Sequence, residues 1–156
     1  MTQTPDSLKL FHPCIAAWFR EEVGRPTAVQ GAAWPRIAAG EHVLVTAPTG
    51  SGKTLTAFLW ALNQLITGAY APGDCRVLYV SPLKALNNDI QRNLLAPLEA
   101  LRGRFEAAGA AVPTLRVLTR SGDTPGRERQ AMQRTPPEIL ITTPESLFLL
   151  LTSAAR

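Results

Sequence analysis

The stretch that most constrains this chain is TAPTGSGKT, at residues 46–54. An apolar run, HVLV, precedes it, and a long helical pattern with no charge after Lys53 follows it at residues 52–66. A glycine turn between a strand and a helix is the connection found in parallel βαβ units. The chain is therefore expected to build a parallel α/β sheet. The turn should lie at the carboxyl end of a strand, where such sheets bind ligands.

Runs rich in Val, Ile and Leu predict four strands, and their weak alternation predicts that helices cover both faces of the sheet. The predicted strands are residues 42–47, 75–81, 114–120 and 138–143. Helical patterns lie before and between them, at about 6–22, 27–39, 52–66, 83–102 and 124–134, with a last one from Glu145. Pro97 is expected to bend or interrupt the fourth of these helices.

The residue types in the loop favour binding of a nucleotide triphosphate. Gly50 and Gly52 permit backbone angles that turn successive N–H groups inward, and the helix start adds its positive end. Lys53 can reach the β- and γ-phosphates, and the Thr54 hydroxyl can bind Mg²⁺. Thr49 and Ser51 complete the predicted ATP site. The alternative is a plain glycine turn with a solvated lysine, and Ala47 stands where the usual pattern has its first glycine.

The other predicted strands also end in polar segments: SPLKALNND (81–89), TRSGDTP (119–125) and TTPESL (142–147). Each has an ordinary structural interpretation, because Thr143 is a good helix cap and SGDT a good turn. Together they would line one edge of the sheet with hydroxyl groups, backbone N–H groups and cations. Such an edge could follow a sugar–phosphate backbone without reading its bases.

Composition sets wider limits. The length of 156 residues fits one domain or a piece of a larger one, and the net charge of +4 favours anionic partners. Two cysteines and two histidines are interpreted as ordinary residues, with no disulfide or metal site: Cys14, Cys75, His12 and His42. No secretory signal or apolar span of about 18–20 residues is visible. A soluble, intracellular, cytoplasmic protein without membrane contact is the expectation.

In their order and spacing, APTGSGKT, SPLKALNND, TRSGDTP and TTPESL resemble the first RecA-like domain of a superfamily 2, DEAD/DEAH-box-type helicase. SPLKALNND with TTPESL resembles the large helicase-related (Lhr) family in particular. RPTAVQ (25–30), with Trp34 and Pro35, resembles the glutamine segment of that group. The resemblance covers about residues 10–152. It implies N-terminal helices with the glutamine segment at 1–40 and an incomplete RecA-like ATP-binding domain at 41–156.

The resemblance also implies roles for individual residues. Gln30 would hydrogen-bond the adenine edge, and Arg25 would lie against the base. Six residues fall in segments that contact nucleic acid in the family, with DNA favoured over RNA: Ser81, Lys84, Arg120, Gly122, Thr143 and Glu145. The three tryptophans are interpreted as core residues. The basic face formed by Arg127, Arg129 and Arg134 fits solvent exposure as well as contact with a strand.

The family's DExH motif, in which the aspartate holds Mg²⁺ and the glutamate polarises the attacking water, does not occur in this sequence. The interpretation is therefore a fragment of an ATP-dependent helicase that is inactive alone, exposes Leu147, Phe148 and Leu149, and is poorly soluble. A nucleotide- and nucleic-acid-binding module without hydrolysis is one alternative. A small P-loop kinase is the other, and the lack of an acidic strand end counts against it.

Overall fold

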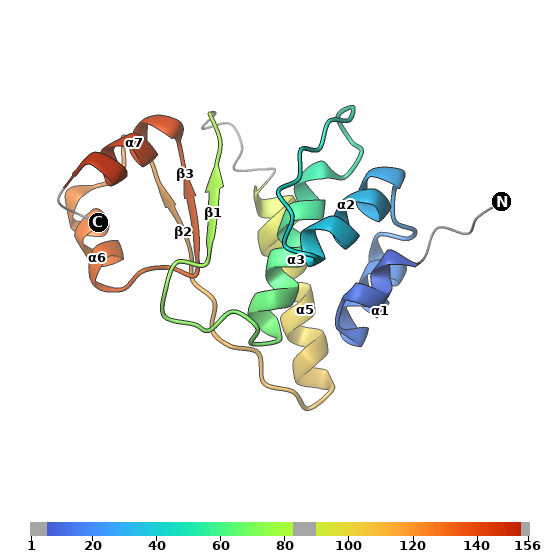
Figure 1. Ribbon diagram of the computed structural model, residues 1–156. Coiled ribbons are helices and arrows are strands. Elements are labelled where there is room, and N and C mark those ends of the chain that lie inside the picture. The colour runs from blue at the N-terminus through green and yellow to red at the C-terminus, as the bar shows by residue number, and fades with distance from the viewer. Residues whose placement is uncertain (1–5, 83–89, 154–156) are drawn as a thin grey trace. The chain divides into compact units, whose positions relative to one another are not determined.

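The computed structural model describes residues 6–82 and 90–153 (Figure 1). The chain divides into two compact units. The first, here called the helical unit, comprises residues 1–67 and 89–112. The second, here called the sheet unit, comprises residues 68–88 and 113–156.

The helical unit is built from helices that begin at identifiable caps. In chain order these are the 3-10 helix η1 (Ser7–Leu10), α1 (Pro13–Glu22), α2 (Ala28–Ala38), α3 (Lys53–Ile66), the π-helical turn η3 (Gln91–Leu95) and α5 (Ala96–Ala107). The single helix predicted over 6–22 is divided, because the His12 ring caps a new helix that starts at Pro13. The expected irregularity at Pro97 is also present, since η3 ends immediately before the α-helix that contains this proline.

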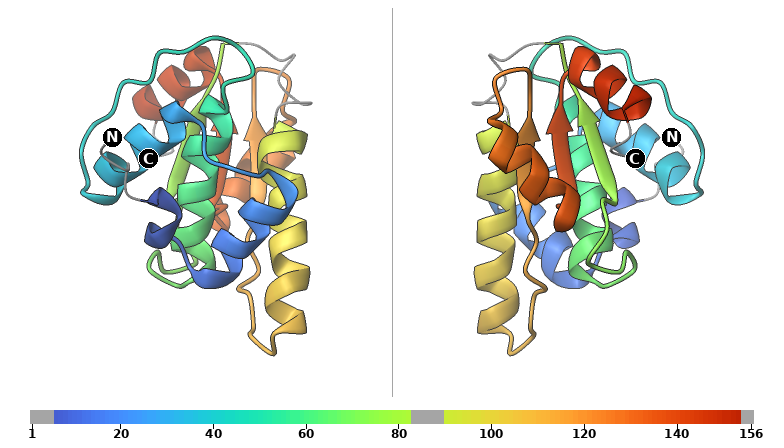
Figure 2. Two further views of the ribbon diagram at one scale, coloured as in Figure 1. Left: turned by 90° about the vertical axis from the view of Figure 1, so that its right-hand side faces the viewer. Right: turned by 90° about the vertical axis from the view of Figure 1, so that its left-hand side faces the viewer.

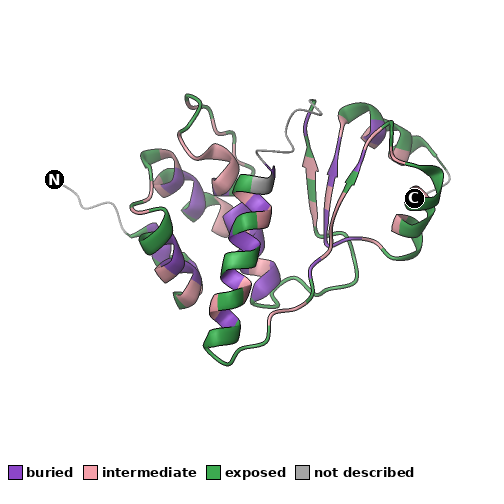
Figure 3. Ribbon diagram, turned by 180° about the vertical axis from the view of Figure 1, so that it is seen from behind, coloured by how far each residue is buried: buried purple, intermediate pink, exposed green. Residues whose placement is uncertain are grey.

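Aromatic side chains form the centre of the helical unit. Phe11 packs edge-to-face against Trp34 at 4.8 Å and Trp60 at 5.5 Å between ring centroids. Trp34 is fully buried, and its Nε1 donates to the Thr56 carbonyl at 2.9 Å. Trp18 is buried and Trp60 half-buried, so the prediction that the tryptophans pack in a core is confirmed. Figure 3 shows buried residues along the helices of this unit.

Among its described residues, the sheet unit has three parallel strands: β1 (Val77–Val80), β2 (Val117–Arg120) and β3 (Ile139–Thr142). Their order is β1-β3-β2, and the helices α6 (Gly126–Arg134) and α7 (Pro144–Thr152) lie against the same face (Figure 2). The expected α/β class, a parallel sheet flanked by helices, is confirmed. Each strand is shorter than predicted, and the edge strand β1 exposes Leu78 and Val80 instead of burying both faces. Only the central strand β3 is largely buried.

The prediction of a strand at residues 42–47 is wrong. This segment has no regular structure, and Leu44 is 89% exposed. A strand requires hydrogen bonds from a neighbouring extended backbone. The helical unit supplies none, because its described regular elements are all helices. The apolar residues of HVLVTA favour β structure, but they form a strand only where a neighbouring strand is available for pairing.

A buried glutamate fastens the amino end of the sheet. The Glu138 carboxylate accepts from the backbone N–H of Gly73 at 3.1 Å and of Arg116 at 2.8 Å. The Arg116 guanidinium lies 3.6 Å from the same carboxylate. The Glu138 carbonyl accepts from the N–H groups of Arg76 and Val77, both at 3.0 Å. One residue therefore joins the segment before β1 and the segment before β2 to β3.

Helix α7 presents an apolar surface to solvent. Phe148 is 65% exposed, Leu149 54% and Leu151 60%. Leu147 is half-buried. The expectation of an exposed apolar patch is thus confirmed for Phe148 and Leu149. Poor solubility, which this patch would favour, stays a prediction.

Candidate nucleotide and nucleic-acid sites

The start of α3 has the backbone geometry of an anion site. Gly50 and Gly52 have φ of 81° and 84°, in the left-handed region that side chains rarely adopt. Gly52 is the N-cap residue of α3, and no side chain caps the helix there. The first N–H groups of a helix have no partner within it, and they carry its positive end. The loop therefore offers uncapped donors to a negatively charged group.

Lys53 lies folded across the loop. Its Nζ donates to the carbonyl oxygens of Ala47 at 2.5 Å and Pro48 at 2.7 Å. A lysine is a mobile point charge with three donors, so it can exchange these carbonyls for phosphate oxygens. In the observed conformation, backbone carbonyl groups of the loop accept the hydrogen bonds of the Lys53 ammonium group.

Two hydroxyl groups of the loop suit a nucleotide and its metal ion. The Ser51 Oγ is the one buried side-chain oxygen or nitrogen without a hydrogen-bond partner in the part of the chain that the structure describes. The Thr54 side chain, at the second position of α3, is half-buried. A buried hydroxyl without a partner is unfavourable unless a ligand or water fills the gap. The loop residues therefore fit a phosphate group with its Mg²⁺.

Gln30 holds the start of α2 against this loop. Its side chain accepts from the Thr27 N–H at 2.9 Å, while the Thr27 hydroxyl accepts from the Gln30 N–H at 3.3 Å. This reciprocal pair is a capping box. Thr27 also donates its hydroxyl to the Ser51 carbonyl at 3.0 Å. Gln30 is only 1% exposed, and a Cβ on Gly52 would lie 2.6 Å from its Nε2.

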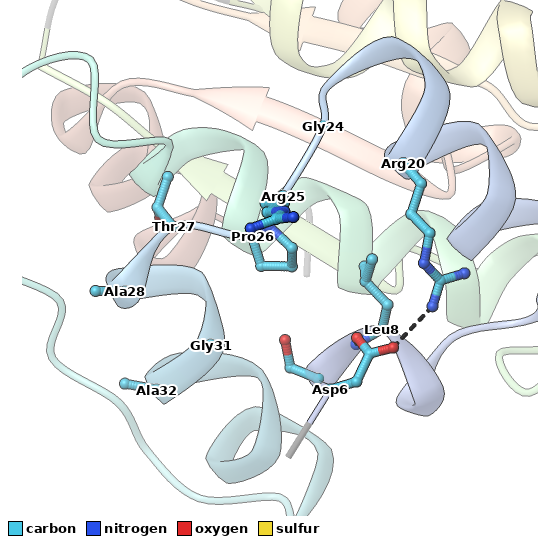
Figure 4. A pocket seen from close by; sticks show the side chains of 11 residues that line it. Asp6, Leu8, Arg20, Gly24, Arg25, Pro26, Thr27, Ala28, Gly31 and Ala32 are labelled. Atoms are coloured by element: carbon cyan, nitrogen blue, oxygen red, sulfur yellow. Dashed lines mark hydrogen bonds and ion pairs between the residues drawn. The ribbon is translucent and has the colours of Figure 1, made fainter. Parts of the chain in front are cut away.

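Arg25 lines a different space from Gln30. A pocket of about 690 Å³ lies between η1, the segment after α1 and the start of α2, and Arg25 is one of the residues that line it (Figure 4). Arg20 and Asp6 form an ion pair of 2.8 Å at the rim of this pocket. The hydrogen bond from Arg20 holds the pKa of Asp6 below its usual value. Gln30 is not among the residues that line the pocket.

The sheet brings most of the predicted nucleic-acid residues to one edge. Val80 and Arg120 both pair with Thr142 in the parallel register, so Ser81, Arg120 and Thr143 lie at neighbouring strand ends. Ser81 extends the ladder by donating its N–H to the Thr142 carbonyl at 3.0 Å. Thr143 caps α7 through the Ser146 N–H at 3.3 Å. Lys84 lies outside the described residues.

This edge of the sheet carries a buried arginine, Arg120, and an exposed carboxylate, Glu145. Burial, and then the charge of Arg129, lower the pKa of Arg120, which is 9% exposed. Gly122 is exposed two residues later. Hydrogen bonds from its own backbone N–H and from the Thr143 hydroxyl lower the pKa of Glu145, so this exposed carboxylate is ionised at neutral pH. A carboxylate repels phosphate, so Glu145 suits a sugar hydroxyl better.

Other kinds of site receive no support from the described residues. Residues 6–82 and 90–153 contain no cluster of three or more acidic, histidine or cysteine side chains arranged for a metal ion. Both cysteines are free. In the same ranges, no helix has the length and apolar character that crossing a membrane requires.

The sequence interpretation missed the parts played by Thr27 and Arg129. The spacing Thr27-x-x-Gln30 is a capping-box signature and could have been recognised. Arg129 donates to the carbonyl oxygens of Thr124 at 2.7 Å and Gly122 at 2.6 Å. Nothing in the sequence distinguishes it from Arg127 on the same helix.

The chain is similar in sequence and in structure to known helicases. The DEAD/DEAH box helicase family matches residues 27–156. The Lhr helicase/probable uracil glycosylase of Mycolicibacterium smegmatis is 51% identical over 99% of this chain, and the Lhr helicase/uracil glycosylase of Escherichia coli is 47% identical over all of it. The chain spans about a tenth of the length of each relative. The resemblance to Lhr proteins is confirmed.

A solved structure agrees in fold. That of Mycobacterium smegmatis helicase Lhr, bound to ssDNA and AMP-PNP, superposes with a TM-score of 0.87 and 51% identity. It covers 96% of this chain, which corresponds to 19% of the solved chain.

Proposed function

The chain belongs to the DEAD/DEAH box helicase family, and on that basis we propose that it is part of an ATP-dependent helicase acting on single-stranded DNA. Residues 41–156 are assigned to the first RecA-like domain, preceded by the glutamine segment within 1–40. The observation that carries the proposal is the start of α3, where two left-handed glycines, uncapped N–H groups and the buried Ser51 hydroxyl meet. This combination favours a polyphosphate.

In the proposed complex, the loop residues bind different parts of ATP and its Mg²⁺ ion. The N–H groups of residues 49–52 and of the first turn of α3 surround the phosphates. Lys53 leaves its two carbonyl partners and neutralises the β- and γ-phosphates, and Thr54 binds Mg²⁺. A Mg²⁺ ion held by Thr54 would supply positive charge to offset that of the phosphates. Gln30 and Arg25 are assigned to the adenine. That role requires Gln30 to share or release its hydrogen bond with Thr27.

DNA is proposed to run along the carboxyl edge of the sheet. Arg120 and the hydroxyl groups of Ser81 and Thr143 are suited to phosphates, together with Lys84, and Gly122 allows close backbone approach. The exposed Glu145 is assigned to a sugar hydroxyl. The choice of single-stranded DNA is supported by the solved M. smegmatis relative, which is described as bound to ssDNA and a nucleotide analogue.

Replacing Lys53 with alanine tests the nucleotide site. Removing a charge-assisted contact with phosphate is expected to weaken binding of a fluorescent ATP analogue by about 10- to 100-fold. Lys9→Ala serves as the control, because Lys9 is an exposed lysine outside the loop. Equal affinities of the two variants would refute the assigned role of Lys53. Binding is the quantity to measure, because the chain is proposed not to hydrolyse ATP by itself.

The proposed inactivity has its own test. Phosphoryl transfer needs groups that position water and neutralise developing charge, and Lys53 and Thr54 supply only part of these. The isolated chain is therefore expected to release no phosphate from ATP above the uncatalysed rate, with or without single-stranded DNA. DNA-stimulated turnover that disappears in Lys53→Ala would show that the chain is an active ATPase.

A further inference from the structure

No residue of helix α6 is buried (Figure 3). The helix carries three arginines, at 127, 129 and 134. Arg129 is the half-buried member of the three, while Arg127 and Arg134 are exposed. Burial therefore singles out Arg129 among three chemically identical side chains.

The Arg129 guanidinium clamps the turn that follows β2. Its Nε donates to the Thr124 carbonyl at 2.7 Å, and its Nη2 donates to the Gly122 carbonyl at 2.6 Å. Only a planar fork of donors reaches two such acceptors from one rigid group. The turn is closed internally as well, because Ser121 N–H donates to Thr124 Oγ1 at 2.9 Å and Thr124 N–H to the Ser121 carbonyl at 3.2 Å.

This arrangement changes what the turn presents to an anion. Carbonyl oxygens repel phosphate, and two of those in the turn are taken up by Arg129. The Gly122 N–H has no acceptor among the described residues, and a Cβ at Gly122 would meet nothing within 4 Å. The side of the turn that carries this N–H is therefore open to a ligand.

Arg120, at the end of β2, supplies the second observation. It is nine-tenths buried, yet its guanidinium has no hydrogen-bond or ion-pair partner within the described residues. Burial and the charge of Arg129 both lower its pKa, so the two cations repel each other. Ser51 Oγ is the one fully enclosed side-chain oxygen or nitrogen without a partner among the described residues, so the unpaired guanidinium nitrogens of Arg120 remain accessible from solvent. An anion can therefore pair with them.

We propose that Arg129 is a positioning residue that fixes the Ser121–Pro125 turn, so that Arg120 and the Gly122 N–H meet the phosphate backbone of single-stranded DNA. The inference rests on the proposed function, because it assigns the turn to the same DNA-binding edge. Arg129 acts through the turn and Arg120 and does not itself contact the phosphate. Its contribution therefore differs from that of a surface charge.

The test compares three arginine substitutions of equal charge change. Arg129→Ala, Arg127→Ala and Arg134→Ala are titrated with fluorescent oligo(dT) at several salt concentrations. Arg129→Ala is expected to lose about tenfold or more in affinity, and each control less than about threefold. Arg129→Lys keeps the charge but replaces the rigid planar fork with a single ammonium group on a flexible stem, so it is expected to recover little. Far-UV circular dichroism checks that α6 stays folded, and Arg129→Lys carries the test if Arg129→Ala does not fold.

A double-mutant cycle with Arg120→Ala separates positioning from direct contact. If Arg129 acts through the turn and Arg120, the loss of affinity in the double variant is smaller than the sum of the two single losses. The salt dependence of binding should also fall by a similar amount in Arg120→Ala and Arg129→Ala, by about 0.7 per lost phosphate contact.

The possible failures are distinct. Additive losses, full recovery in Arg129→Lys, or equal losses in Arg129→Ala and Arg127→Ala would overturn the inference while leaving DNA binding intact. Absence of oligo(dT) binding by the unmodified chain would overturn the proposed function, and the inference with it.

Discussion

Replacing Gly52 with alanine is expected to lower the affinity for ATP analogues by more than about 100-fold, because two separate penalties combine. The φ of 84° places the new residue in the left-handed region, where a side chain costs about 1–2 kcal/mol. The added Cβ would also lie 2.6 Å from the Gln30 Nε2. Gln30 is held by its hydrogen bond with Thr27, so relieving the contact disrupts the capping box of α2.

Gly50→Ala is the matched control. Gly50 has nearly the same φ, 81°, but a Cβ there would meet nothing within 4 Å. It carries the backbone strain alone, so about a tenfold loss is expected. Titration of a fluorescent ATP analogue measures both variants. Equal losses would show that the Gly52–Gln30 contact contributes nothing.

Glu138→Ala is expected to lower the free energy of unfolding of the sheet unit by about 3 kcal/mol. The substitution leaves the N–H groups of Gly73 and Arg116 without their acceptor at a site that is 2% exposed. Asp74→Ala is the control, because Asp74 is an exposed acid paired with Arg76, and about 0.5 kcal/mol or less is expected. Urea titration, with amide exchange of β3 as the local measurement, compares the two. Similar effects would contradict the clamping role of Glu138.

The same carboxylate predicts a dependence of stability on pH. Burial alone would raise the pKa of Glu138, but hydrogen bonds from the N–H groups of Arg116 and Gly73, with the charge of Arg116, bring it below the ordinary value of 4.5. The unfolded chain therefore takes up the proton first as the pH falls. The contribution of Glu138 is fully present above the ordinary value and is lost as the pH falls through the lower, folded-state pKa. In Glu138→Gln this part of the acid dependence should disappear.

The outcome at residues 42–47 shows where sequence reasoning succeeds and where it fails. The Val, Ile and Leu runs that formed β1, β2 and β3 differ little in composition from HVLVTA. Strand formation depends on a partner from elsewhere in the chain, and local composition carries no information about that partner. Helix α3 was predicted nearly to the residue because its pattern and its glycine start are local.

The candidate sites also contain some features that follow from the sequence and others that depend on the tertiary structure. The positive φ of Gly50 and Gly52 follows from the residue type, and the common edge of Ser81, Arg120 and Thr143 follows from parallel topology. The hydrogen bonds from Arg129 to the turn could not be predicted, since they depend on the direction of two backbone carbonyls. The separation of Arg25 from Gln30 likewise depends on the tertiary position of η1 beside α2.

The irregular conformation of residues 42–47 has a consequence for the protein at high concentration. The segment is apolar, free of proline and prone to β structure, and Leu44 stands almost fully in solvent. Such a segment is a template for pairing with a strand of another molecule. The edge strands β1 and β2 of a second copy are potential partners. We therefore expect high concentration to favour strand pairing between molecules at the very residues that lead into the phosphate loop.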